Sequence, residues 1–215
     1  MSTDGRAQRG RLVTIEGIEG VGKSTNVAFI ADHLRQRGRS VRITREPGGV
    51  PVAERIRELL LATDSNGPPP MCELLLLFAA RSAHLEQLVC PALDAGHWVV
   101  CDRFTDASYA YQSGGRGLPE SAVRTLERLV QGDLQPDLTI LLNAAVQETA
   151  IRRRERGAND RFERLNSEFF ERVRSAYLEL ARREPARIRV IDASRPLHEV
   201  QGQIAEVLDS FIANQ

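Results

Sequence analysis

Lysine is almost absent from this chain of 215 residues. Lys23 is the one lysine, and the other 28 basic residues are arginine. Net charge is absent too, which excludes the overall charge signature of a protein that binds nucleic acid or a membrane surface. No apolar run is long: the longest, Leu74–Ala80, is too short to cross a bilayer. The polar first eleven residues lack the apolar segment of a signal peptide.

Cysteine is scarce as well. Cys72, Cys90 and Cys101 are odd in number and lack metal-ligand spacing, which predicts reduced, mostly buried thiols in a cytoplasmic protein. The length and the 42% hydrophobic content suit one soluble α/β domain over residues 1–215, with residues 1–10 as a flexible tail.

The single lysine lies in Gly17–Ser24, which fits the phosphate-binding pattern G-x-x-x-x-G-K-[ST]. Glycines suit such a loop because its backbone N–H groups must approach phosphate oxygens closely. Lys23 would bind the β- and γ-phosphates, where a slim ammonium fits and a planar guanidinium does not. The Ser24 hydroxyl would hold Mg²⁺. A structural glycine turn is the alternative, but the apolar strand before the loop and the helix after it favour phosphate binding.

Strands and helices alternate along the chain, which predicts a parallel sheet covered by helices. Near-continuous apolar runs indicate strands buried on both faces. The expected strands are Leu12–Glu16, Ser40–Arg45, Trp98–Asp102, Leu138–Leu142 and Ile188–Ile191. The expected helices are Ser24–Arg37, Val52–Leu61, Met71–Ala95, Glu120–Gln131, Val146–Arg156, Ser167–Arg183 and Leu197–Ile212. The fold class is therefore α/β: a three-layer P-loop NTPase fold with a five-stranded parallel sheet and a short lid segment.

Ligands of such sheets bind at the carboxyl ends of the strands, so the residues there are candidates for a site. Asp102 ends an apolar strand in the Walker-B arrangement, and its carboxylate would hold Mg²⁺ directly or through water. The adjacent Arg103 suggests a second phosphate; a structural ion pair is the alternative. The turn Arg45–Gly49 allows close backbone approach and is equally compatible with a plain turn.

Two further segments suit a nucleotide base. Gln112, before a glycine-rich turn, offers both a donor and an acceptor to a base edge, although the segment also suits a helix end. Phe78 and Arg81 share one helical face and could stack on a base and hydrogen-bond it. The alternative is that Phe78, after four leucines, belongs to the core.

An arginine-dense segment, residues 152–164, is predicted to be a lid. A solvated charged face is the usual explanation of such a run. The functional alternative is closure that brings an arginine to the transferring phosphoryl group, which is worth about 10³ to 10⁵ in rate in phosphoryl-transfer enzymes.

Taken together, these segments resemble the thymidylate kinase (dTMP kinase) family from about Leu12 to Leu208. The matching motifs are Glu16–Ser24, Thr44–Gly49, Asp102–Phe104, Ala110–Gln112 with Gly114–Gly117, and Arg156 with Asp160–Glu163. The resemblance implies transfer of the γ-phosphoryl group of ATP to dTMP, giving dTDP and ADP in dTTP biosynthesis. It also implies ATP and Mg²⁺ as cofactors and a homodimer, without nucleic-acid or membrane partners.

The resemblance implies a role for each matched residue. The residues that would bind ATP are Gly17, Ile18, Glu19, Gly20, Val21, Gly22, Lys23, Ser24 and Thr25. Glu19 would also face the 3′-hydroxyl of dTMP. Arg57 and Arg103 would hold the dTMP phosphate, Phe78 would stack on thymine, and Arg81 and Gln112 would bind its edge. Ser108 would lie near the sugar carbon that lacks a 2′-hydroxyl. Glu46 and Pro47 complete the expected substrate-binding set, and Ile191–Pro196 would lie near adenine.

Members of this family supply a catalytic arginine either from the phosphate loop or from the lid. Gly20 occupies the loop position here, so the chain resembles the second, bacterial arrangement. The candidates are Arg152, Arg154 and Arg156, which join Lys23, Asp102 and Arg103 as expected catalytic residues. Three positions depart from the common pattern: Leu77 in the register of the stacking aromatic, Phe104, and Asn143.

Other functions fit less well. A P-loop kinase that acts on a nucleoside would not need the phosphate-holding pair Arg57 and Arg103, although another monophosphate remains open. A GTPase needs an Asn-Lys-x-Asp motif, which a chain whose only lysine is Lys23 cannot contain. The third alternative is a nucleotide-binding module without turnover, against which Asp102, Arg103 and the arginines of the lid argue.

Overall fold

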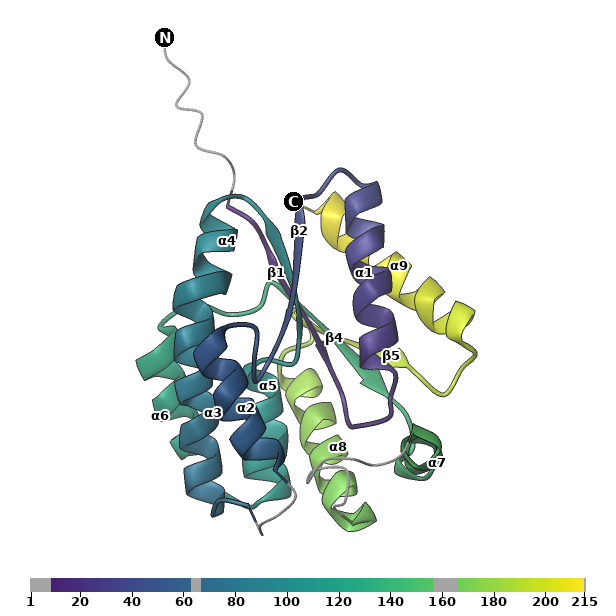
Figure 1. Ribbon diagram of the computed structural model, residues 1–215. Coiled ribbons are helices and arrows are strands. Elements are labelled where there is room, and N and C mark those ends of the chain that lie inside the picture. Colours follow the sequence, from purple (N-terminus) through teal and green to yellow (C-terminus); the bar gives the residue numbers. More distant parts are fainter. Residues whose placement is uncertain (1–8, 63–66, 157–165, 215) are drawn as a thin grey trace.

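The computed structural model describes residues 9–62, 67–156 and 166–214, without the side chains of 153–156. Its centre is a parallel five-stranded sheet in the order β2-β3-β1-β4-β5 (Figure 1). The strands are β1 (Leu12–Glu16), β2 (Val41–Arg45), β3 (Trp98–Asp102), β4 (Leu138–Asn143) and β5 (Ile188–Asp192). Each predicted strand is confirmed, with ends that differ by at most one residue.

The register brings three strand ends together. Ile15 of β1 and Arg45 of β2 both pair with Asp102 of β3. The loops that follow these three strands therefore leave the sheet side by side, at its carboxyl edge.

Burial differs between the middle and the edges of the sheet. The strands β1, β3 and β4 are buried almost throughout, whereas β2 and β5 each expose most of their residues. The prediction that all five strands are buried on both faces is thus wrong for β2 and β5. Both are edge strands, where the helical layers end, and Ile43 and Val190 remain about half exposed there.

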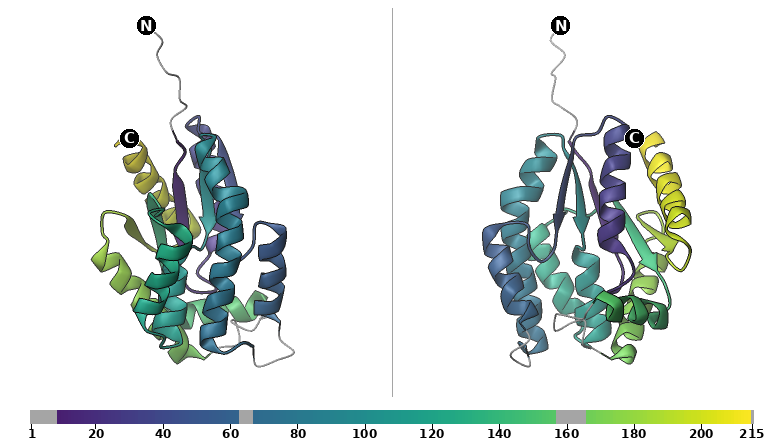
Figure 2. Two further views of the ribbon diagram at one scale, coloured as in Figure 1. Left: turned by 90° about the vertical axis from the view of Figure 1, so that its left-hand side faces the viewer. Right: turned by 45° about the vertical axis from the view of Figure 1, so that its right-hand side comes forward.

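Helices form a layer on each face of the sheet (Figure 2). On one face, α1 (Lys23–Gln36) packs beside α9 (Leu197–Ala213). The remaining helices are α2 (Pro51–Leu61), α3 (Pro70–His84), α4 (Cys90–Asp94), α5 (Thr105–Ser108), α6 (Glu120–Gln131), α7 (Val146–Arg156) and α8 (Ser167–Arg183). No helix in these described ranges combines the length and apolar character needed to cross a membrane.

The helix predicted over Met71–Ala95 is interrupted. A π-helical turn, η1 (Leu85–Val89), separates α3 from α4. Pro91, in the first turn of α4, has no N–H to donate to the preceding turn, and it accounts for the change of hydrogen-bond pattern.

A helical segment that was not predicted follows β3. It consists of α5 and a π-helical turn, η2 (Tyr109–Gly115). Gly114 and Gly115 allow this segment to pack closely on α8, because neither has a side chain. A Cβ on Gly114 would lie 2.5 Å from the Cβ of Ala176, and one on Gly115 would lie 2.6 Å from the ring of Phe169. The composition of this stretch indicates a turn, but its close packing on α8 makes it helical.

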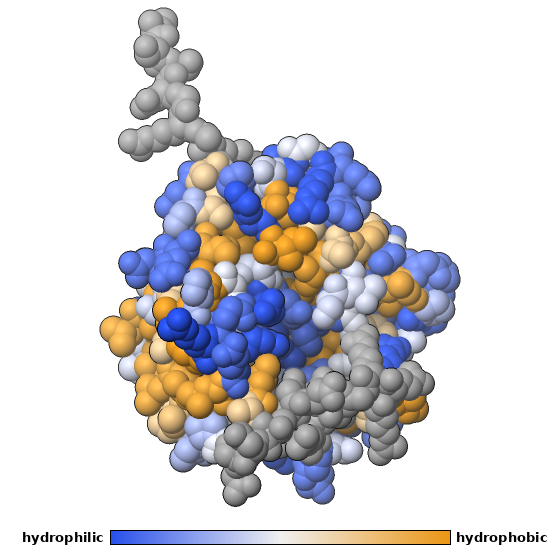
Figure 3. Space-filling view, in the orientation of Figure 1, coloured by the Kyte–Doolittle hydropathy of each residue, from blue (hydrophilic) through white to orange (hydrophobic). Residues whose placement is uncertain are grey.

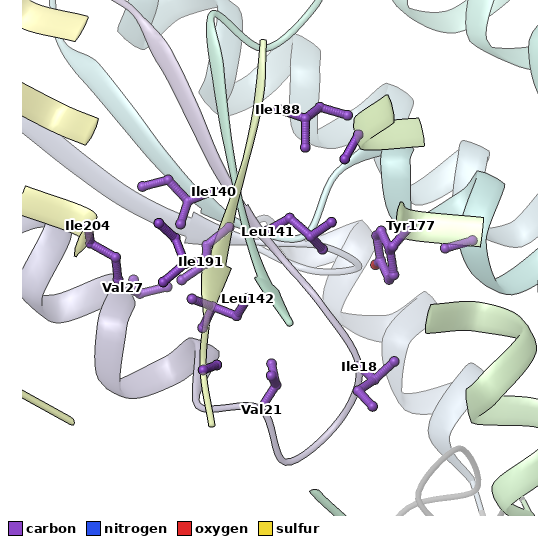
Figure 4. Packing of buried hydrophobic residues seen from close by; sticks show 14 of the residues in the cluster. Ile18, Val21, Val27, Ile140, Leu141, Leu142, Tyr177, Ile188, Ile191 and Ile204 are labelled. Atoms are coloured by element: carbon purple, nitrogen blue, oxygen red, sulfur yellow. The ribbon is translucent and has the colours of Figure 1, made fainter. Parts of the chain in front are cut away.

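The largest apolar cluster fills both sides of the sheet (Figure 4). Val27 of α1 and Ile204 of α9 lie on one side, and Tyr177 of α8 lies on the other. Ile18 and Val21, from the loop after β1, also belong to this cluster. Gly10, the last residue of the predicted tail, is buried, and its N–H donates to the carbonyl oxygen of Leu93 at 2.8 Å, whereas residues 1–8 lie outside the described residues.

Candidate active site

The loop between β1 and α1 has the backbone of a phosphate-binding loop. Gly17 and Gly22 adopt φ values of 135° and 102°, which residues with a Cβ rarely adopt. A Cβ on Gly17 would also lie 2.5 Å from the carbonyl oxygen of Leu142. Because the side chains of Ile18 and Val21 are buried, the core holds this loop in place.

Lys23 begins α1, and its ammonium group folds back over the loop. Nζ donates to the carbonyl oxygens of Gly17 at 2.9 Å and Ile18 at 3.0 Å. Burial and the charge of Arg103 lower the pKa of Lys23 to about 8, although Asp102 and other nearby carboxylates act in the opposite direction. A phosphate beside Nζ would strengthen the charged form, so the electrostatics of the loop favour an anion.

Arg103 links the phosphate loop to a second part of the site. It follows β3 directly and has φ 70°, the only left-handed non-glycine residue in the described ranges. Its Nη2 donates to Glu19 Oε1 at 2.8 Å and to the Tyr111 hydroxyl at 3.1 Å, and Nη1 donates to the Tyr177 hydroxyl at 3.3 Å. Burial raises the pKa of Glu19, but Arg103 and Lys23 outweigh it and hold that pKa below its ordinary value. A charged carboxylate therefore fixes the guanidinium.

Glu16 lies behind this group and is fully buried. Its carboxyl oxygens accept hydrogen bonds from the Phe104 N–H and from the Tyr177 hydroxyl, each at 2.6 Å. Burial and the charge of Asp106 raise the pKa of Glu16 to about 8, against the opposing effect of Arg103. The Glu16 side chain is thus mostly protonated at neutral pH while it supports Tyr177.

A cavity of about 180 Å³ opens beside Arg103. Its lining combines two carboxylates and three arginines with apolar side chains, the mixture expected of a site for a charged organic molecule. The lining residues are Glu19, Glu46, Pro47, Arg57, Leu60, Leu61, Leu77, Arg81, Arg103, Phe104, Ala107, Ser108, Tyr111 and Gln112.

Every residue predicted to bind substrate lines this cavity, with the exception of Phe78. Phe78 is buried with Leu74 and Val123, and its ring lies 4.5 Å from the Arg81 guanidinium carbon. The Phe78 ring thus packs in the core and does not line the cavity, and stacking of Phe78 on a base stays a prediction. Leu77, one residue earlier and about 100° around the helix, lines the cavity instead.

Arg81 is the most enclosed of the three arginines, at 3% exposure. Its Nε donates to Glu46 Oε2 at 2.7 Å and its Nη2 donates to Ser108 Oγ at 3.2 Å. Nη1 is buried and has no hydrogen-bond partner within the described residues. One corner of the guanidinium group thus remains available to an acceptor.

The other predicted polar residues are also held by protein contacts. Gln112 Nε2 donates to Glu73 Oε1 at 3.0 Å, and Glu73 is in turn bound by Arg116. Arg57 Nη1 donates to the carbonyl oxygen of Pro47 at 3.0 Å, and the Glu46–Pro47 peptide bond is cis. The hydrogen bond from Arg57 to Pro47 joins α2 to the turn after β2, at one wall of the cavity.

The side chains of Asp102 and Ser24 show whether the residues of the site could hold a divalent cation. Asp102 Oδ1 is buried, and no donor in the described part of the chain satisfies it. Oxygen ligands of this kind suit Mg²⁺, and the exposed Ser24 at the start of α1 offers a hydroxyl. Within the described residues, no group of three or more His, Cys, Asp or Glu side chains is arranged to hold a metal ion.

The predicted lid is only partly described. Arg152, in the middle of α7, donates to the carbonyl oxygen of Ala193 at 3.3 Å, within the segment Ile191–Pro196 expected to lie near adenine. The side chains of Arg154 and Arg156 and residues 157–164 of the lid lie outside the described residues.

Sequence reasoning missed several members of the site. Tyr111 stands in the stretch that was singled out for Gln112, but it was given no role. Tyr177 and Glu16 support Arg103 from α8 and β1. The chain has only three tyrosines, so their scarcity was a usable signal.

The phosphate-binding loop carries one ammonium group, and Arg103 joins it to a cavity lined by two more arginines. This arrangement defines a P-loop kinase that acts on an anionic acceptor. A family model described as "Thymidylate kinase" matches residues 15–204. The chain belongs to the thymidylate kinase family, enzymes that transfer the γ-phosphoryl group of ATP to dTMP in nucleotide biosynthesis.

Individual relatives agree with this assignment. The chain is 54% identical over 204 residues to the thymidylate kinase of Methylococcus capsulatus, across 95% of this chain and 97% of that one. It is 55% identical over 207 residues to the thymidylate kinase of Chromohalobacter salexigens, across 95% and 98%. The crystal structure of thymidylate kinase from Ehrlichia chaffeensis matches with a TM-score of 0.77 and 30% identity, over 93% of this chain and 99% of that chain.

Proposed function

We propose that the cavity beside Arg103 is the dTMP site and that Gly17–Thr25 is the ATP site of this kinase. The observation that carries the proposal is Arg103 itself. It is bound to Glu19 of the phosphate loop while it lines the cavity, so one guanidinium lies between the donor and the acceptor sites.

The phosphate of dTMP would be held by Arg57 and Arg103. Both line the cavity, and planar guanidinium groups suit the paired hydrogen bonds that a phosphate accepts. This pair favours a monophosphate over a nucleoside as the acceptor. Glu19 would then face the 3′-hydroxyl of the sugar, and Ser108 would face C2′.

The thymine base would lie between Leu77 and the polar end formed by Arg81 and Gln112. The unsatisfied Nη1 of Arg81 suits a carbonyl acceptor, and leaving it unpaired would be costly. Leu77 replaces Phe78 in the proposal, because only Leu77 lines the cavity.

The phosphates of ATP would bind Lys23 and the backbone N–H groups of the loop. Mg²⁺ would be held by Ser24 and Asp102, and when bound it would neutralise charge on the phosphates. The acceptor oxygen of dTMP is already anionic, so in-line transfer needs no strong general base. The residues of the site would act by positioning the two nucleotides and excluding water.

The catalytic arginine would come from Arg152, Arg154 or Arg156. Arg152 is bound to the carbonyl oxygen of Ala193 and would have to release it to reach the transferring group. A kinetic comparison of the three alanine variants tests this assignment: the catalytic arginine is the one whose loss lowers kcat at least 10³-fold.

We also propose a cytoplasmic homodimer. Three free thiols support a reducing compartment, although the prediction that they are mostly buried is wrong: Cys101 is buried, but Cys90 is partly exposed and Cys72 is exposed. Large exposed apolar side chains on α2, α3 and α6 support a dimer interface, and Figure 3 shows apolar surface over the region of α2 and α3. Leu129 on α6 is 78% exposed. A Leu129→Glu variant should sediment as a monomer, whereas dimers of unchanged affinity would place the interface elsewhere.

The function is tested by ADP release with ATP and Mg²⁺ across dTMP, dUMP, dCMP, dGMP, dAMP, UMP and thymidine. Strong preference for dTMP is the expected result. Preference for another monophosphate would keep the P-loop kinase but refute the thymine pocket. Activity on thymidine equal to that on dTMP would refute the role of Arg57 and Arg103.

A further inference from the structure

We propose that His84 is a positioning residue that fixes Arg81 for recognition of the acceptor base. The proposal rests on the function proposed above, in which Arg81 binds the base edge. His84 itself does not line the cavity, and it would act through Glu46.

A buried chain of hydrogen bonds connects the two residues. His84 Nε2 lies 2.7 Å from Thr44 Oγ1, and His84 Nδ1 lies 3.0 Å from Glu46 Oε1. The other oxygen of the same carboxylate, Oε2, accepts from Arg81 Nε at 2.7 Å. His84 is fully buried, and Glu46 is 5% exposed. Strand β2, the turn after it and helix α3 thus converge on one guanidinium.

The contacts of Arg81 explain why such support matters. A long arginine side chain has many rotamers, and their freedom must be removed before the group can select one ligand. Glu46 fixes its Nε edge, Ser108 fixes Nη2, and the ring of Phe78 lies against its face. Nη1 is left facing no partner in the described residues. If Glu46 rotated, the direction of Nη1 would change.

The hydrogen-bond partners assign the protons of His84. Arg81 can only donate, and the Glu46 carboxylate accepts, so His84 Nδ1 carries a proton toward Glu46. The Thr44 hydroxyl can donate to Nε2. The backbone encloses this pair: a Cβ on Gly49 would lie 2.5 Å from Thr44 Oγ1 and 2.8 Å from the His84 ring. His84 therefore has little room to move away from Glu46.

Three variants of His84 separate positioning from packing. The side-chain amide of asparagine reproduces the Nδ1 donor, that of glutamine reproduces the Nε2 position, and leucine reproduces neither. We expect His84→Leu and His84→Gln to raise the KM for dTMP about 10-fold and His84→Asn to stay within about threefold of wild type, with the KM for ATP unchanged in all three. Thermal unfolding of each variant measures its stability separately.

A base-free acceptor analogue provides the control. 2-Deoxyribose 5-phosphate should inhibit the wild type and all three variants equally, because it lacks the base that Arg81 reads. Loss of dTMP binding that follows the loss of thermal stability, with no rescue by asparagine, would overturn the proposal. A wild type that prefers dTMP and a His84→Leu variant with an unchanged KM would overturn this inference alone. A wild type with no preference for dTMP would overturn the proposed function as well.

Discussion

Replacing Glu16 with glutamine should remove a pH dependence from the stability of the fold. Glu16 is fully buried, and burial together with Asp106 raises the pKa of Glu16 from 4.5 to about 8. The native state therefore binds this proton more tightly than the unfolded state. The stabilisation is present in full below about pH 4.5 and is lost as the pH rises through about 8.

The magnitude follows from the pKa difference between the two states. At about 1.4 kcal/mol per pKa unit, the wild type should lose about 3 to 4 kcal/mol relative to Glu16→Gln between pH 5 and pH 9. This loss is a large share of the 5 to 15 kcal/mol typical of a folded domain. Glutamine cannot ionise, and its amide can still accept the hydrogen bond from the Phe104 N–H.

The assay is urea unfolding of both proteins at five pH values from 5 to 9, with the difference in unfolding free energy plotted against pH. A Glu58→Gln variant removes one exposed carboxylate and controls for the change in net charge. A difference between wild type and Glu16→Gln that stays constant within about 1 kcal/mol over this range would refute the reasoning, because the carboxyl group would then not change its charge there.

Four substitutions test the site directly. Lys23→Ala should abolish phosphoryl transfer and leave the circular dichroism spectrum unchanged, and normal turnover would refute the loop assignment. Arg103→Ala should raise the KM for dTMP and lower kcat, since it would bind both the ground state and the transition state; an effect on ATP kinetics alone would mean that Arg103 is misassigned. Leu77→Ala should raise the KM for dTMP with a small loss of stability, whereas Phe78→Ala should cost about 3 to 5 kcal/mol of unfolding free energy. The reverse pattern would return Phe78 to the base site.

The fold was predictable where burial alone decides the structure. The central strands are apolar runs, and their ends agreed with the sequence to within one residue. The segment Thr105–Gly115 was not predictable, because glycine favours turns locally, and only contact with Ala176 and Phe169 of α8 makes it helical. Tertiary packing overrides local preference there.

The candidate site was predictable to the extent that it follows strand ends. Asp102 and Arg103 come directly after an apolar strand, and parallel strands bring such positions to one edge. Leu77 and Phe78 could not be told apart, because helix rotation is set by packing against α6 and not by local sequence. Tyr177, 74 residues from Arg103 in sequence, carries no local signal of its contact with it.

The close approach of Gly114 to Ala176 makes the proposed dTMP site depend on the spacing of two helical segments. Gly114 has no left-handed backbone, so its lack of a side chain, and not its conformational freedom, is what this position needs. Tyr111 and Gln112 lie on η2, and Tyr177 lies on the helix that η2 touches. A single methyl group at Gly114 would force η2 and α8 apart. Tyr111 and Gln112 on η2 would then move relative to Tyr177 on α8. Gly114→Ala should therefore raise the KM for dTMP and leave the KM for ATP unchanged. The small volume of Gly114 would then determine specificity, although this residue contacts no ligand.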